Sequence, residues 1–158
     1  MSPIKILLAI IYNKIILGTA FAVLIAQFTK IFTNFFKTKT FDYTFTFSSS
    51  GMPSGHTSGV IALTTLIGIK AGFDSVLFAL SFGIAVVIMY DAMGVRRQAG
   101  EHAKMLNYLL DKYTIYASEN EDKKHYLKVR IGHTINEVLV GIVNGIFCAL
   151  VFVYFFGL

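Results

Sequence analysis

Two short patterns in the sequence combine residue types that can bind phosphate and transfer protons. The first is Pro53-Ser54-Gly55-His56, directly before an apolar run. Proline suits the first turn of a helix, where its missing N–H costs nothing, and a helix N-terminus attracts anions. Ser54 and Gly55 would offer a hydroxyl and approachable amides, and His56 can exchange a proton near neutral pH. The pattern fits either an anion site or a capped helix start with a buried histidine.

The second pattern is Arg130-x-x-His133-x-x-x-Glu137, which continues to Gly141 and Gly145. Spacings of three and four residues place all five on one helical face. A carboxylate one turn from an imidazole can fix its tautomer, which leaves the other ring nitrogen free to attack or to transfer a proton. The glycines would let this helix pack closely against a neighbour. The alternative is an interfacial histidine in a helix-end salt bridge.

The composition indicates that these residues are positioned by membrane helices. Of the 158 residues, 55% are hydrophobic and only 15% are charged, whereas soluble domains carry about 25% charged residues. The length allows one integral membrane domain over residues 1–158, with about four spans of roughly 20 residues each. The single cysteine, Cys148, lies in an apolar run and is expected to be a small core residue.

The predicted fold is an all-α, polytopic membrane helix bundle with about four spans. The expected spans are about Lys14 to Phe36, a short one from His56 to Ile69, about Ser75 to Met93, and about Ile131 to Phe156. Residues 95–117 carry apolar side chains at three- and four-residue spacing with charges between them. They predict an amphipathic helix that lies at the membrane interface or caps the bundle.

Four spans would put both termini on one side and the loops 37–55 and 95–131 on the other. Most Lys and Arg residues lie in those loops. The positive-inside rule therefore places them at the cytoplasmic face of a multi-pass cell-membrane protein. We attribute the net charge of +5 to this bias and to cations that bind lipid headgroups or a phosphate substrate. No nucleic acid is expected as a partner.

Together, the two patterns resemble the type-2 phosphatidic acid phosphatase superfamily, which includes vanadium haloperoxidases. The resemblance rests on Pro53-Ser54-Gly55-His56 and on His133-x-x-x-Glu137-Val138-x-x-Gly141-x-x-x-Gly145. Lys30 and Lys37-Thr38 have the spacing of the family's first motif, Lys-x6-Arg-Pro. The stretch from Met89 to Gly100, with Leu106-Asn107 after it, is similar to the divergent bacterial and plastid branch.

The resemblance implies a role for each matching residue. His133 would be the nucleophile that forms a phosphohistidine, Glu137 would orient it, and His56 would be the general acid. The phosphate-binding residues would be Lys30, Lys37, Ser54 and Gly55. The family uses no metal, because cations and amides stabilise the phosphoryl oxygens.

The sequence departs from the family's pattern in three respects. Leu127 stands where the third motif has an arginine, six residues before the histidine, and Arg130 or the pair Arg96-Arg97 would have to supply that charge. Glu137 replaces an aspartate. The chain also has fewer than the family's six spans.

The expected function is a lipid-phosphate phosphatase acting on a phosphomonoester such as phosphatidylglycerophosphate or phosphatidate. Three alternatives remain: an undecaprenyl diphosphate phosphatase, a metal-dependent enzyme, and a non-catalytic lipid-phosphate binder or transporter. In the metal-dependent enzyme, His133, Glu137 and Asp91 would bind a divalent cation that activates water. Otherwise Asp91 is expected to be a structural acid paired with Arg96 or Arg97. The glycine faces also favour a homodimer.

Overall fold

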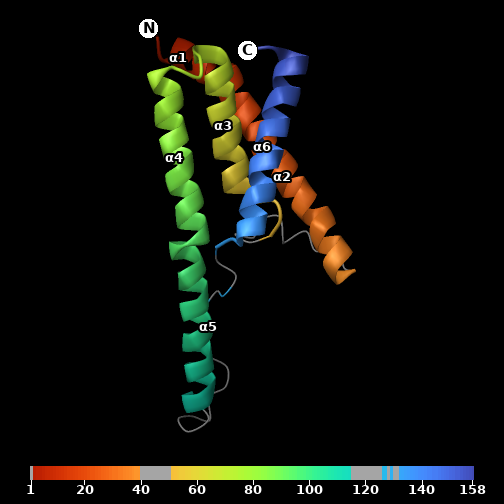
Figure 1. The fold of residues 1–158 in the computed structure, drawn as a ribbon, viewed down its shortest axis with the longest axis vertical. Helices are drawn as coiled ribbons and strands as arrows, with labels where there is room; N and C mark the ends of the chain where they lie inside the picture. The colour runs from red at the N-terminus through yellow and green to blue at the C-terminus, as the bar shows by residue number, and fades with distance from the viewer. Residues whose placement is uncertain (1, 40–50, 115–125, 128, 130–131) are drawn as a thin grey trace.

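The computed structural model describes residues 2–39, 51–114, 126–127, 129 and 132–158, and within these residues every regular element is a helix. The helices are α1 (Pro3–Ile11), α2 (Lys14–Thr38), α3 (Gly55–Ala71), α4 (Val76–Met93), α5 (Val95–Thr114) and α6 (Ile135–Phe156). The expected all-helical bundle is therefore confirmed (Figure 1).

Polar caps define where the long helices begin. Asn13 accepts hydrogen bonds from the N–H groups of Ile15 and Ile16 at the start of α2. Ser75 accepts one from Phe78 at the start of α4. Such caps satisfy backbone donors that have no partner within the helix, and this need is strongest where water is excluded.

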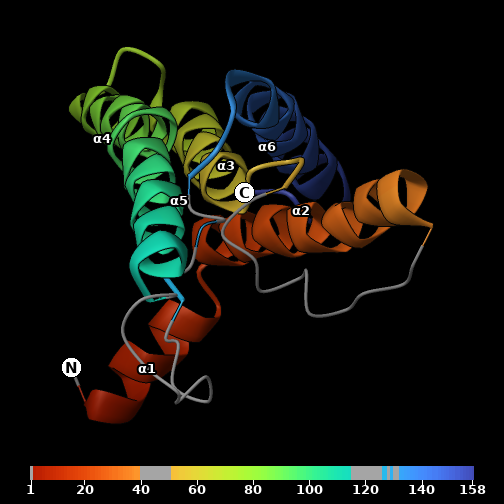
Figure 2. The same ribbon diagram turned by 90° about the horizontal axis from the view of Figure 1, so that it is seen from below.

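Helix α3 lies at the centre of the bundle and packs against α2, α4 and α6, and α2 also packs against α6 (Figures 1 and 2). The core between α2, α3 and α6 consists of small and apolar side chains: Ala22, Ala62, Leu66, Cys148, Ala149 and Phe152. Cys148 is 1% exposed, which confirms its expected place in the core.

Three stretches are long and apolar enough to cross a membrane: Lys14–Phe36, Val76–Lys112 and Ile135–Phe156. The remaining expected span, α3, has 17 residues, which is about 26 Å at 1.5 Å per residue. It is shorter than the roughly 30 Å hydrocarbon layer. Because α2, α4 and α6 surround it, α3 is an enclosed central helix.

The amphipathic helix expected over residues 95–117 forms over Val95–Thr114 in the described residues. Of its two expected places, the one that caps the bundle is wrong, and the one at the membrane interface stays a prediction. Helix α5 follows α4 after a break at Gly94 and continues along nearly the same line, out of the bundle (Figure 1). Among the described helices it packs only against α4. A single glycine between two helices does not supply the sharp turn that would bring α5 back over the bundle.

Both termini lie at one end of the bundle, as expected from the four-helix path of the chain (Figure 1). At this end the Lys14 ammonium donates a hydrogen bond of 2.9 Å to the carbonyl of Phe156, near the C-terminus of α6. The opposite end holds the start of α3, the start of α6 and the junction of α4 with α5. This second end carries the two sequence patterns.

Candidate functional site

The His133–Glu137 pair forms the centre of the site. His133 Nδ1 lies 2.9 Å from Glu137 Oε2, and the two side chains are 3% and 15% exposed. A carboxylate that accepts the Nδ1 proton fixes the tautomer in which Nε2 carries the lone pair. The buried pair can therefore present a nucleophilic nitrogen.

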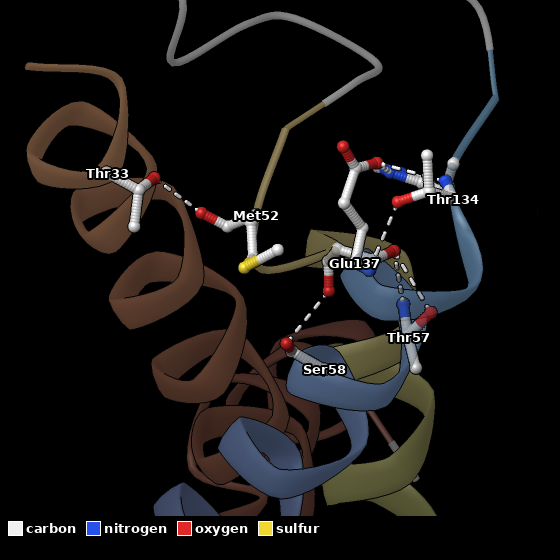
Figure 3. Close-up of polar contacts among 8 residues, drawn as sticks. Thr33, Met52, Thr57, Ser58, Thr134 and Glu137 are labelled. Atoms are coloured by element: carbon white, nitrogen blue, oxygen red, sulfur yellow. Dashed lines mark hydrogen bonds and ion pairs between the residues drawn. The ribbon is translucent and has the colours of Figure 1, made fainter. Parts of the chain in front are cut away.

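Other hydrogen bonds hold the Glu137 carboxylate in place. The N–H of Thr134 donates to Glu137 Oε2 at 3.2 Å, and the Glu137 N–H donates to Thr134 Oγ1 at 3.4 Å, which makes a capping box at the start of α6. Figure 3 shows the Glu137 side chain beside Thr134. An acid restrained in this way is suited to orient the histidine.

The junction of α4 with α5 positions His133 from the other side. The N–H of His133 donates a 3.0 Å hydrogen bond to the carbonyl of Ala92. The preceding residue, Gly132, has a φ of +85°, and a Cβ built on it would lie 2.4 Å from the nitrogen of Arg97. Only glycine fits this conformation and this close approach to another backbone.

Asn107 holds the chain that returns from α5 toward His133. Its side chain donates to the carbonyl of Leu127 and accepts from the N–H of Leu127, both at 2.9 Å. The Leu127 side chain is 45% exposed. Leu127 therefore lies beside α5, where it is held by its backbone and contributes no charge to the site.

The start of α3 contacts α6 directly. The N–H of Ser54 donates to the carbonyl of Glu137 at 3.0 Å, and Ser58 Oγ donates to the carbonyls of Ser54 and Gly141 at 2.8 and 3.2 Å. Figure 3 shows Ser58 and Glu137 in this contact region. A Cβ at Gly141 would lie 2.9 Å from Thr57 Cβ. The expected close packing at this glycine is confirmed, with α3 as the neighbour.

Ser54 acts as the cap of α3. Its fully buried Oγ accepts from Thr57 N at 3.3 Å and from Thr57 Oγ1 at 3.0 Å. Because its N–H is bonded to the carbonyl of Glu137, Ser54 fixes the position of the helix end. Because its Oγ is buried and accepts from Thr57, the hydroxyl does not face outward. The first-turn amides of Gly55 and His56 have no acceptor within the helix, so they are the groups at this end that can receive a phosphate oxygen.

Helix α2 contributes a buried cation and a tie to the segment before Pro53. Lys30 is 2% exposed and lies within electrostatic range of Glu137 and His56. Thr33 Oγ1 donates to the carbonyl of Met52 at 2.6 Å, as Figure 3 shows. This bond holds the entry to α3 against the helix that carries Lys30.

His56 lies at the first turn of α3, outside the three candidate spans, and its side chain is exposed. The surrounding protein displaces water from the imidazole and lowers its pKa below 6.5, and the charges of Arg96, His133 and Lys30 act in the same direction. Asp91 opposes them. A bound phosphate dianion would reverse this balance and favour the protonated, acid form.

The remaining expected site residues are partly outside this cluster. Arg96 Nε forms a 2.6 Å ion pair with Asp91, both about half exposed, and Arg97 is exposed beside it. The side chain of Lys37 and the whole of Arg130 lie outside the described residues. Within the described chain no three His, Cys, Asp or Glu side chains gather as a metal site would require, so Asp91 does not join His133 and Glu137.

Residues 11–148 match the profile of the Divergent PAP2 family. The chain belongs to this family. The chain is also similar to the uncharacterized membrane protein YuiD of Bacillus subtilis (strain 168), with 38% identity over 152 residues, which cover 91% of this chain and 96% of that protein. No solved structure matches the chain. It is therefore a divergent PAP2 membrane protein, and its resemblance to that family is confirmed.

Three residues position the site in this PAP2 family member although the sequence patterns gave them no role: Gly132, Ala92 and Asn107. Ala92 and Asn107 were noted only as part of the stretch that resembles the divergent branch. Gly132 carries a visible signal, a glycine directly before the candidate nucleophile. Ala92 acts only through its carbonyl, and Asn107 acts through the backbone of a residue 20 positions away. Neither contact leaves a periodic pattern in the sequence.

Proposed function

We propose that this protein is a membrane lipid-phosphate phosphatase that hydrolyses a phosphomonoester through a phosphohistidine on His133. The observation that carries the proposal is the buried His133–Glu137 pair, bonded through Ser54 to the start of α3 and close to Lys30 and His56. Family membership supports the same chemistry.

In the first step, Nε2 of His133 attacks phosphorus and the phosphorus–oxygen bond to the lipid alcohol breaks. His56 gives its proton to the leaving alkoxide, so the alcohol departs neutral. Glu137 stabilises the positive charge that develops on the imidazole. The Lys30 ammonium and the amides at the start of α3 stabilise the phosphoryl oxygens.

In the second step, a water molecule attacks phosphorus and the phosphorus–nitrogen bond to His133 breaks. His56, now neutral, takes a proton from this water, which returns it to its acid form and releases inorganic phosphate. The same two histidines thus serve both halves of the reaction, and each ends in its starting protonation state.

The substrate we propose is a phospholipid monoester in the cytoplasmic leaflet, such as phosphatidylglycerophosphate or phosphatidate. The cationic residues at the site end of the bundle support this orientation through the positive-inside rule. Undecaprenyl diphosphate would fit more naturally with an outward-facing site and is the second substrate to test.

The test is phosphate release from purified protein with each of these lipids, with and without a chelator. We expect release that is insensitive to the chelator and is lost in His133→Ala. His102→Ala is the matched control, because His102 is an exposed residue on α5. Full activity of His133→Ala would refute the mechanism, and loss of turnover in chelator would favour a metal-dependent enzyme.

A non-catalytic lipid-phosphate binder is the second candidate function. It is favoured by Leu127, which holds the position of the family's third-motif arginine, is bonded to Asn107 on α5 and is 45% exposed. Binding of a lipid phosphate with no release, in wild type and His133→Ala alike, would identify this function.

A further inference from the structure

A cavity of about 270 Å³ lies between α2 and α3, next to the candidate site. The two helices run in opposite directions here, so Gln27 faces the level of Gly55 and Val23 faces that of Gly59. A Cβ on Gly55 would lie 3.1 Å from Gln27 Nε2, and one on Gly59 would lie 2.8 Å from Val23 Cγ2.

The polarity of the cavity changes along its length. The end nearest the candidate site is lined by Gln27 and His56, and the other end by Val23, Val60, Leu63 and Thr19. The Thr19 hydroxyl donates to the carbonyl of Ile15 within its own helix, so this end offers no free hydroxyl proton. The cavity therefore begins at the proposed general acid and continues into apolar surroundings. The alcohol that leaves a lipid phosphate has the same order of polarity, with a polar oxygen at the phosphate and a hydrocarbon chain further away.

The side chain of Gln27 has an unmet hydrogen-bonding requirement. Its Oε1 is buried and has no hydrogen-bond partner among the described residues. A buried carbonyl oxygen without a donor is unfavourable. The Gln27 side chain lines the cavity, and a rotation of its terminal amide, a torsion with broad preferences, would turn Oε1 into the cavity, where it can accept an O–H or N–H group of a ligand. The ligand group that donates this hydrogen bond would lie near His56, because Gln27 and His56 line the same cavity.

The size of the cavity limits what it can hold. Sites that enclose drug-sized molecules are about 300–1,000 Å³, so about 270 Å³ fits one polar segment of a lipid and the first part of its chain. A whole diacyl lipid must extend beyond it, into the membrane.

We propose that Gln27 is a specificity-determining residue that accepts a hydrogen bond from a hydroxyl on the carbon next to the phosphate ester. This inference rests on the proposed function and names the substrate class: lipid phosphates whose leaving alcohol is a glycerol with a free neighbouring hydroxyl. Phosphatidylglycerophosphate has this hydroxyl, whereas phosphatidate and undecaprenyl diphosphate do not.

The test compares phosphatidylglycerophosphate with its deoxy analogue, in which 1,3-propanediol replaces the terminal glycerol and only that hydroxyl is missing. The wild-type protein in detergent is expected to prefer the hydroxylated lipid about tenfold in kcat/KM, the ratio expected when a buried acceptor is left unpaired. In Gln27→Met, of similar length but without the acceptor, the ratio should fall to about one.

The matched control is Thr29→Val. Thr29 is two residues from Gln27 on α2, outside the cavity, and its hydroxyl is bonded to the carbonyl of Ile25 within the same helix. We expect it to keep the wild-type ratio. Thermal unfolding of each variant shows whether it is folded, and a ratio is compared only between folded proteins.

Equilibrium binding of the two lipids to His133→Ala separates this inference from the proposed function. If binding discriminates tenfold but no phosphate is released by the wild type, the catalytic proposal fails and the role of Gln27 stands. If the wild type turns over both lipids equally, or if Gln27→Met keeps the wild-type ratio, the inference is overturned. Failure to bind either lipid overturns both.

Discussion

Gly132→Ala tests whether the junction of α4 with α5 positions the candidate nucleophile. Glycine at this position adopts φ +85°, and a Cβ would lie 2.4 Å from Arg97 N and 2.6 Å from Arg97 Cα. These are backbone atoms, so no side-chain rotation can relieve the overlap. The chain before His133 must move, and the 3.0 Å bond from His133 N to Ala92 O is the contact that such a movement breaks.

The magnitude follows from two contributions. An alanine in the left-handed region costs about 1–2 kcal/mol, and loss of the backbone hydrogen bond costs about 1 kcal/mol. The variant should therefore be about 2–3 kcal/mol less stable. For a chain of this size that corresponds to a decrease in Tm of about 4–12 °C. Displacement of His133 should also reduce phosphate release more than tenfold, since small misplacements of a catalytic group are costly.

The assay is thermal unfolding in detergent together with phosphate release, with Gly83→Ala as the control. A Cβ at Gly83 would meet no atom within 4 Å. Because alanine is favoured over glycine inside a helix by about 1 kcal/mol, this variant should be as stable as wild type or more so. Equal stability of the two variants would refute the assignment of Gly132 as a positioning residue.

Three further predictions concern the other contacts of the site. Glu137→Gln removes the carboxylate that orients His133 and should lower kcat by about 10³–10⁴-fold. The control is Glu101→Gln, in an exposed ion pair on α5, which should change kcat less than twofold. Similar kcat values for the two variants would argue against a catalytic role of the His133–Glu137 pair. Gly145→Ala would place a Cβ 2.6 Å from the carbonyl oxygen of Ser58 and should destabilise the protein by about 1–3 kcal/mol, with an unchanged Tm counting against close α3–α6 packing. Because the pKa of His56 is lowered on folding, the unfolded state binds more protons just below pH 6.5, so stability should fall as pH decreases through that range. His56→Gln should lose less stability over the same range, and identical pH profiles would contradict the lowered pKa.

The helices could be predicted from the sequence because their apolar length is a local property. A stretch such as Lys14–Phe36 has to be helical in a membrane, since its backbone groups have no water to bond. The caps that the structure shows at Ser54 and Thr134 are also local, because each bonds an N–H of its own helix, although neither residue was predicted in this role. Their spacing of four residues predicted the pairing of His133 with Glu137, but as two residues on one turn of a helix. In the structure His133 lies before α6, which begins at Ile135 after the Thr134 cap, so the pair forms across the start of the helix and the expected single helical face is wrong for His133.

The direction of α5 could not be predicted in this way. Its amphipathic pattern describes two faces of a helix but not what those faces meet. The structure continues α5 from α4 across Gly94, and this places Ala92 and Arg97 where they contact the segment before His133.

The sequence by itself determined the membrane class, the helical bundle, the family and the two patterns that carry the candidate chemistry. The tertiary structure decided which groups of those patterns remain available. Ser54, expected to bind phosphate, uses its hydroxyl to cap α3 and its N–H to bond Glu137. Gln27, which no pattern singled out, holds a buried acceptor beside His56. The physical reason is that spacing along a chain fixes neighbours within one helix, whereas hydrogen bonds between helices depend on how those helices pack.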